Sequence, residues 1–151
     1  MIRLWGVVLA ANLVGTYLFA LCVERVHIFS PEIQQTLTAV SHDGVGAGFW
    51  VVVMRAIFAG WLIALMVWLL PGAESARVSI IIILTYLIGL GGFNHVIAGS
   101  TKMFFLVATG AESWGFYFGR FLAPTLLGNI IGGVSLVAFL GHAQVVAGKE
   151  A

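Results

Sequence analysis

The sequence predicts an all-α membrane protein, with three full membrane spans and one broken helix in a single transmembrane domain over residues 1–151. Of the 151 residues, 61% are hydrophobic and 9% are charged, and the mean hydropathy is +1.08. A soluble domain has about 25% charged residues. The charges in this chain are too few to build a polar surface, so the chain is expected to lie in a lipid bilayer.

The N-terminal third of the chain contains one predicted span and one polar connection. A hydrocarbon core of about 30 Å needs about 20 helical residues, and the apolar run over residues 4–23 supplies them. Residues 26–48 are rich in polar side chains and are not expected to cross lipid. Ser30 and Pro31 form a helix start signal in this connection, so we expect a short interfacial helix over residues 32–40.

Two further full spans are predicted over residues 49–70 and residues 121–140, because both runs are apolar and long enough to cross. A connection over residues 110–120 precedes the last span, and a short polar tail over residues 142–151 follows it. Aromatic side chains gather in the connection, as expected of a belt at a membrane interface. They are Trp114, Phe116, Tyr117 and Phe118.

An apolar run of unusual length, over residues 78–109, separates these two spans, and we interpret it as a broken helix. The first half of the run gives roughly 24 Å of helix, which is too short to cross comfortably. The whole run gives roughly 48 Å, which is too long for one straight span. Gly91 and Gly92 accept backbone angles that other residues avoid. We therefore predict two half-helices joined by a break at residues 91–100.

An internal repeat relates the first span to the last. Residues 11–15 and residues 128–132 share the order small, Asn, aliphatic, aliphatic, Gly, with Asn12 and Asn129 at the second position. An unpaired amide in hydrocarbon is costly, so two asparagines in matched surroundings are not expected from composition alone. Transporters built from inverted repeats combine such repeated motifs with broken helices near the membrane midplane. On this interpretation the second repeat is complete, and the first retains only its third member.

Three stretches of the sequence carry a resemblance to a known family. They are Gly92-Phe93-Asn94-His95-Val96-Ile97-Ala98, then Gly128-Asn129-Ile130-Ile131-Gly132-Gly133, and Arg55-Ala56-Ile57 with Trp61-Leu62 and Val67-Trp68. In these stretches the chain resembles the formate/nitrite transporter family, one of whose motifs is Gly-Phe-x-His-x-Ile-Ala. The resemblance covers nearly the whole chain, which would correspond to the third through sixth helices. It implies an aquaporin-like helical bundle, here partial.

The resemblance also implies a function, partners and a location. A family member is expected to form a homopentamer in the cell inner (plasma) membrane, with one pathway per protomer for small monovalent anions such as formate or nitrite. The histidine of the broken helix would lie between two hydrophobic constrictions, with the asparagine of the sixth helix close by. By residue match these are His95 and Asn129. We therefore expect a channel or transporter, not an enzyme, that contacts the lipid bilayer and small anions, with no nucleic acid or cofactor.

Several positions depart from the family pattern. The family's usual glutamate before the histidine is Asn94 here, the asparagine usual after Ile-Ala is Gly99, and an asparagine often found in the fourth helix is Gly60. The first two helices of the family have no counterpart in the sequence, so we expect a divergent branch or a fragment. The alternative function is a truncated, non-transporting membrane scaffold or degenerate subunit.

The chemistry of the predicted pathway follows from the cost of taking an anion out of water, which is several kcal/mol even after relaxation. The N–H groups of a half-helix that starts near residues 98–101 would lower this cost. His95 can attract an anion when protonated or pass its proton on, so channel-like flow and proton-coupled movement both stay open. The predicted pathway residues are His95, Asn129, Asn94, Gly99, Ser100 and Lys102.

These residues also have structural interpretations. His95 can be a neutral packing residue, and Asn12 and Asn129 can bond to backbone freed at a helix break rather than to a substrate. Lys102 is either a side chain that reaches the membrane interface or an attractor for anions. No spacing of histidine and cysteine indicates a metal site, and no nucleophile–base pair or phosphate loop supports catalysis.

Overall fold

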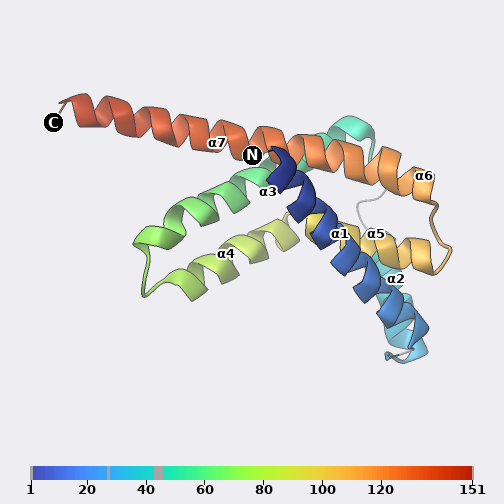
Figure 1. Ribbon diagram of the computed structural model, residues 1–151. Coiled ribbons are helices and arrows are strands. Elements are labelled where there is room, and N and C mark those ends of the chain that lie inside the picture. Colours follow the sequence, from blue (N-terminus) through green and yellow to red (C-terminus); the bar gives the residue numbers. More distant parts are fainter. Residues whose placement is uncertain (1, 27, 43–45, 151) are drawn as a thin grey trace. The chain divides into compact units, whose positions relative to one another are not determined.

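The computed structural model describes residues 2–26, 28–42 and 46–150, with side chains up to residue 146 (Figure 1). These residues form helices and turns and contain no strand, which confirms the predicted all-α class. Three helical stretches are long and apolar enough to cross a membrane: Ile2–Arg25, Phe49–Gly72 and Trp114–Val146. The elements in order are α1 (Ile2–Arg25), α2 (Pro31–His42), α3 (Phe49–Leu69), η1 (Leu70–Gly72), α4 (Arg77–Leu90), α5 (Val96–Ala108), α6 (Trp114–Phe116), η2 (Tyr117–Leu122) and α7 (Ala123–Glu150).

The contacts divide the chain into two compact units. The first unit consists of Met1–Phe49 and Val96–Pro124, and the second consists of Trp50–His95 and Thr125–Ala151. The first unit contains α1, α2, α5, α6 and η2, and the second contains most of α3 and α7 together with α4. Helix α2 is the short helix expected over residues 32–40.

In the first unit, α1 and α2 both pack against α5. Because lipid tails are as apolar as the core side chains, this association rests on close packing rather than on exclusion of water. The buried core extends from α5 to α1 and η2, so it fixes three segments that are distant in the sequence. Its members are Ala20, Val23, Met103, Phe104, Phe105, Leu106, Tyr117 and Phe121.

The C-terminal end of α5 is closed by its own backbone. Gly110 has a φ of +76°. Its N–H donates to the Val107 carbonyl at 3.1 Å, and the Ala111 N–H donates to the Leu106 carbonyl at 2.9 Å. This pair of bonds around a left-handed glycine is a Schellman motif, which satisfies carbonyls that a helix end otherwise leaves open.

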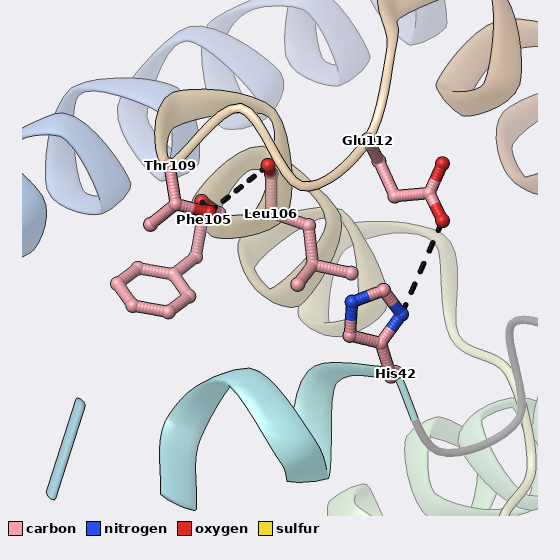
Figure 2. Close-up of polar contacts among 5 residues, drawn as sticks. All are labelled: His42, Phe105, Leu106, Thr109 and Glu112. Atoms are coloured by element: carbon pink, nitrogen blue, oxygen red, sulfur yellow. Dashed lines mark hydrogen bonds and ion pairs between the residues drawn. The ribbon is translucent and has the colours of Figure 1, made fainter. Parts of the chain in front are cut away.

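Polar side chains support the same turn, as Figure 2 shows. Thr109 Oγ1 donates to the carbonyls of Phe105 and Leu106, at 3.1 Å each. His42 Nδ1, in the last turn of α2, lies 4.0 Å from Glu112 Oε1, a contact that is an ion pair only when the imidazole is protonated. The end of α2 therefore lies beside the turn that follows α5.

Glycines allow α3 and α7 to approach closely in the second unit. Gly60 on α3 and Gly128 and Gly132 on α7 are buried, and a Cβ atom at any of them would collide with the other helix. Small residues are the usual contact between paired membrane helices. Trp61 Nε1 on α3 also donates to Ser135 Oγ on α7 at 2.8 Å, so a polar bond accompanies the close contact.

The break in the long apolar run is shorter than the one predicted. α4 ends at Leu90 and α5 begins at Val96, so only residues 91–95 are non-helical. The predicted half-helix start near residues 98–101 is therefore wrong. Val96 and Ser100 are one helical turn apart and both are buried, so packing draws this stretch into the helix.

The last helix is longer than predicted at both ends. α7 continues to Glu150, so the polar tail predicted from residue 142 onward is helical through Glu150. Helical structure also begins early, at Trp114, where the Ser113 side chain caps the first turn. Pro124 follows the π-helical segment η2 closely. Proline lacks an N–H and its ring displaces the carbonyl four residues earlier, which accounts for the widened turn.

Candidate functional site

The break at residues 91–95 begins with a hydrogen-bonded turn at the end of α4. Gly92 has a φ of +59°. Its N–H donates to the Gly89 carbonyl at 3.2 Å, and the Phe93 N–H donates to the Ile88 carbonyl at 3.0 Å. This is again a Schellman motif. A residue with a Cβ in this left-handed conformation costs about 1–2 kcal/mol, so glycine allows the chain to leave the helix without losing its hydrogen bonds.

The ring of Phe93 turns back over the break. A Cβ at Gly91 would lie 2.6 Å from Phe93 Cε2, so the ring occupies space that only glycine leaves open. The same ring stacks on Phe58 of α3, with centroids 5.3 Å apart and an interplanar angle of 27°. An aromatic pair of this kind contributes about 0.5–1.5 kcal/mol beyond its buried area. This aromatic pair holds the break against α3.

The side-chain amide of Asn129 on α7 also holds the break. Asn129 Nδ2 donates to the Asn94 carbonyl at 2.9 Å and to the carbonyl of Ala56 on α3 at 2.8 Å. A primary amide has two N–H donors, and the two carbonyls use both. One side chain therefore joins α7, α3 and the break.

Two polar side chains at the break make no hydrogen bond within the described part of the chain. Asn94 Nδ2 is buried and has no acceptor there, and the partly buried His95 imidazole has no partner there either. A buried donor without an acceptor costs about 1–3 kcal/mol. Metal binding is not indicated, since the described residues include no group of three or more His, Cys, Asp or Glu placed to hold an ion. The break therefore presents donors suited to an anionic or polar ligand.

Two other predicted pathway residues lie on α5 in the first unit, where both have packing contacts. Ser100 Oγ donates to the Val96 carbonyl at 2.6 Å and shares a 3.0 Å hydrogen bond with the Tyr117 hydroxyl. A Cβ at Gly99 would collide with the ring of Phe121. These contacts account for a small residue at 99 and a hydroxyl at 100, and a pathway role for either residue stays a prediction.

Asn12, the repeat partner of Asn129, has a different set of contacts. Asn12 Nδ2 donates to the Val8 carbonyl at 2.8 Å, four residues earlier in α1, and the side chain is exposed. It therefore bonds within its own helix, whereas Asn129 joins three segments. Lys102, the remaining predicted pathway residue, is exposed on α5 and forms no ion pair with the residues that the structure describes.

Several contacts near these residues had no clear signal in the sequence. The hydrogen bond from Asn129 to the Ala56 carbonyl could not be predicted, because every residue has a backbone carbonyl and residue type does not show which one accepts. Tyr117 is 1% exposed, so its predicted place in an interfacial aromatic belt is wrong. Its ring lies 4.5 Å from that of Phe104 between centroids, and buried Ser100 satisfies its hydroxyl. A serine within an apolar half-helix is the one feature of the sequence that indicates this contact, because a buried tyrosine hydroxyl needs a hydrogen-bond partner.

The chain is similar to one protein family and to two curated proteins. Residues 1–143 match the family model described as formate/nitrite transporter. The chain is 39% identical over 145 residues to the inner membrane protein YfdC of Escherichia coli (strain K12), which covers 96% of this chain and 47% of that protein. It is 31% identical over 147 residues to the uncharacterized transporter YrhG of Bacillus subtilis (strain 168), which covers 91% of this chain and 54% of that protein.

The chain spans about half the length of the curated relatives it matches. No solved structure matches it. The matched family is one of transporters, in keeping with the prediction that the chain is not an enzyme. The three long apolar helices and the similarity to an inner membrane protein indicate a multi-pass protein of the inner membrane, as predicted. From the match over residues 1–143, the chain belongs to the formate/nitrite transporter family.

Proposed function

We propose that the protein moves small monovalent anions such as formate or nitrite across the membrane, and that the break at residues 91–95 lines their pathway. Membership of a transporter family supports this class of activity. The observation that carries the assignment to the break is the buried amide donor of Asn94, which lacks an acceptor among the described residues. An anion that passes beside this donor supplies the missing acceptor.

The residue type at position 94 favours an anion. A hydrogen bond to a charged group contributes about 1.5–3 kcal/mol, more than a bond between neutral groups. This offsets part of the cost of taking a small anion out of water. Where the family pattern has a glutamate, Asn94 is neutral and its amide group can donate a hydrogen bond to an anion.

His95 and the start of α5 provide two further favourable features. The imidazole of His95 attracts an anion when protonated and can pass its proton to a weak-acid anion. α5 begins at Val96, directly after His95 in the chain. The N-terminus of a helix carries about half a positive elementary charge and favours anions. We propose that His95 holds the proton that couples to anion movement.

Anion flux into liposomes that contain the full protein tests the role of Asn94. Asn94→Leu removes the donor with little change in volume, and we expect it to slow formate or nitrite flux about tenfold or more. The Asn94 donor has no acceptor among the residues that the structure describes, so thermal stability should not fall. Asn12→Leu is the matched control, since it removes an amide that bonds within its own helix, and it should leave flux unchanged.

His95→Ala tests the second group. We expect flux to fall and its pH dependence to flatten, because histidine is the side-chain type that changes charge near neutral pH. Unchanged flux in both Asn94→Leu and His95→Ala contradicts the assignment of the pathway to the break. No flux of formate, nitrite or another small anion through the wild-type protein contradicts the activity itself and favours the non-transporting scaffold.

A further inference from the structure

The first unit contains an apolar cavity of about 210 Å³ between α1, α2 and α5. Two of its lining residues, Phe19 and Phe29, are 60% and 38% exposed, so the cavity is not closed on their side. An apolar cavity of about 150 Å³ holds a benzene molecule, so this one accommodates a stretch of hydrocarbon chain. Its apolar walls consist of Phe19, Ala20, Val23, Phe29, Leu37 and Phe105.

The cavity lies at the end of a membrane span. Its wall on α1 belongs to the last two turns of that helix, and the charged residues Glu24 and Arg25 follow directly and end it. Its wall on α2 belongs to a short helix that also carries Glu32 and Gln35, which are exposed. A charged helix end beside a short helix with polar and apolar faces marks the boundary between lipid headgroups and acyl chains. The first carbons of an acyl chain lie at this level.

Lys102 alone is charged among the described residues that line the cavity. No carboxylate in the described part of the chain forms an ion pair with it. Glu24 Oε2 lies 2.8 Å from Arg25 Nε, so that carboxylate already has a cation. The long apolar stem of a lysine can follow an apolar wall while its ammonium reaches the polar layer. The cavity therefore combines a hydrocarbon-lined interior with one available positive charge.

We propose that this cavity binds one acyl chain of an anionic phospholipid, whose phosphate pairs with Lys102. The wall of the cavity is mostly apolar, which favours hydrocarbon as its occupant over water or a free anion. A cation between membrane helices at the headgroup level selects anionic lipids. The proposal does not rest on the transport activity proposed above, because none of the lining residues belongs to the break at residues 91–95.

Native mass spectrometry of the full protein in detergent, titrated with dioleoylphosphatidylglycerol or dioleoylphosphatidylcholine, tests the proposal. We expect the wild-type protein to bind the anionic lipid more tightly. Lys102→Gln should weaken binding of the anionic lipid about fivefold, and leave binding of the neutral one unchanged, because the acyl contacts remain. Arg120→Gln is the matched control, since Arg120 is an exposed cation of the same unit outside the cavity, and it should change neither.

A second variant fills the cavity. Ser41 lies in its wall and is 5% exposed, so Ser41→Leu should weaken binding of both lipids. Glycerol 3-phosphate has the charge of a headgroup without an acyl chain, and it should not displace bound lipid. Equal binding of the two lipids by the wild-type protein, or an unchanged affinity for the anionic lipid in Lys102→Gln, overturns the proposal. A lipid-free dimer with cross-links between cavity residues of two copies also overturns it.

Discussion

An asparagine suits position 129 because its amide has two N–H donors on a short side chain. These donors reach the carbonyls of Asn94 and Ala56, which lie on different segments of the second unit. A carbonyl oxygen has two lone pairs, so the Ala56 carbonyl can accept from its own helix and from Asn129 together. Lipid offers no water to replace a lost bond. A change at Asn129 therefore affects the break and α3 at once.

Replacement of Asn129 tests this double contact. Asn129→Ala should lower stability by about 1–3 kcal/mol, because the Asn94 carbonyl loses its partner. Asn129→Asp should lower it further, since it keeps the size of the side chain but directs acceptors at two carbonyl oxygens. Thermal unfolding in detergent measures both effects, and Asn12→Ala, at an exposed amide, serves as a control with a change of about 0.5 kcal/mol or less. Wild-type stability in Asn129→Asp contradicts the two-bond arrangement.

Two glycines that stand where the family pattern has asparagine lie at close contacts. A Cβ at Gly60 would lie 2.6 Å from the backbone oxygen of Asn129, and a Cβ at Gly99 would collide with the ring of Phe121. In membrane helices, small residues allow backbones to approach and gain packing contacts. At both positions the glycine lacks the polar side chain of the family pattern, and it allows the neighbouring segment to pack more closely.

Gly60→Ala should destabilise the protein by about 1–3 kcal/mol, because α3 and α7 must move apart to admit the methyl group. Gly141→Ala is the matched control on α7, where a new Cβ meets nothing within 4 Å. It should raise stability by up to about 1 kcal/mol, since alanine favours helix over glycine. Thermal unfolding of the two variants in the same detergent compares them. Equal stability would show that the helices do not touch at Gly60.

Among the elements, the two halves of the broken helix end in the same way. α4 ends with Gly92 in the left-handed conformation, and α5 ends with Gly110 in that conformation. In both, the glycine N–H and the following N–H donate back to carbonyls three and five residues earlier. Each half-helix therefore ends with hydrogen bonds that come from its own local sequence.

Substitutions at two nearby glycines test this local termination. Gly92→Ala forces a Cβ into left-handed backbone and should destabilise the protein by about 1–2 kcal/mol. Gly89→Ala, three residues earlier in α4, meets nothing within 4 Å, and it should stabilise the helix by up to about 1 kcal/mol. Unfolding in detergent measures the pair. The proposed termination fails if Gly92→Ala proves the more stable of the two.

The start of the break can be predicted from the sequence, but its end cannot. An apolar run of 32 residues is too long for one span, and Gly91 and Gly92 mark where it is interrupted. Val96 and Ser100 lie in α5 and are both buried, and tertiary packing of this kind overrides local preference. The sequence leaves both a pathway role and a structural role open for Asn129. The carbonyls that its amide binds cannot be predicted from residue type, because they are backbone groups.

Over the whole molecule, every long helix exposes large apolar side chains. Trp5 on α1 is 59% exposed, Trp50 on α3 72%, Ile82 on α4 60% and Phe139 on α7 69%. Lipid or other protein can cover such a surface, and in water it would mark a site of association. Membrane helices associate through packing and small residues rather than through hydrophobicity. The exposed apolar faces are therefore available for contacts with the bilayer and with further copies of the chain.

We propose, from the family resemblance, that copies of the protein assemble into a pentamer with one pathway in each protomer. Native mass spectrometry of the protein released from lipid nanodiscs should show the pentamer as the dominant assembled species. Tetramers and hexamers should be absent, since closed cyclic symmetry fixes the number of copies. A protein that stays monomeric at all concentrations, or a continuous ladder of oligomers, contradicts the pentamer.

The hydrogen bond from Asn129 to the Asn94 carbonyl also orients the peptide group that carries this carbonyl. The peptide bond between Asn94 and His95 is trans, so its N–H points opposite to its C=O. The carbonyl is directed at the Asn129 side chain, and the His95 N–H is therefore directed away from it. Each peptide unit has a dipole of about 3.5 D. Asn129 thus sets the direction of this peptide dipole, whose positive end is turned away from α7.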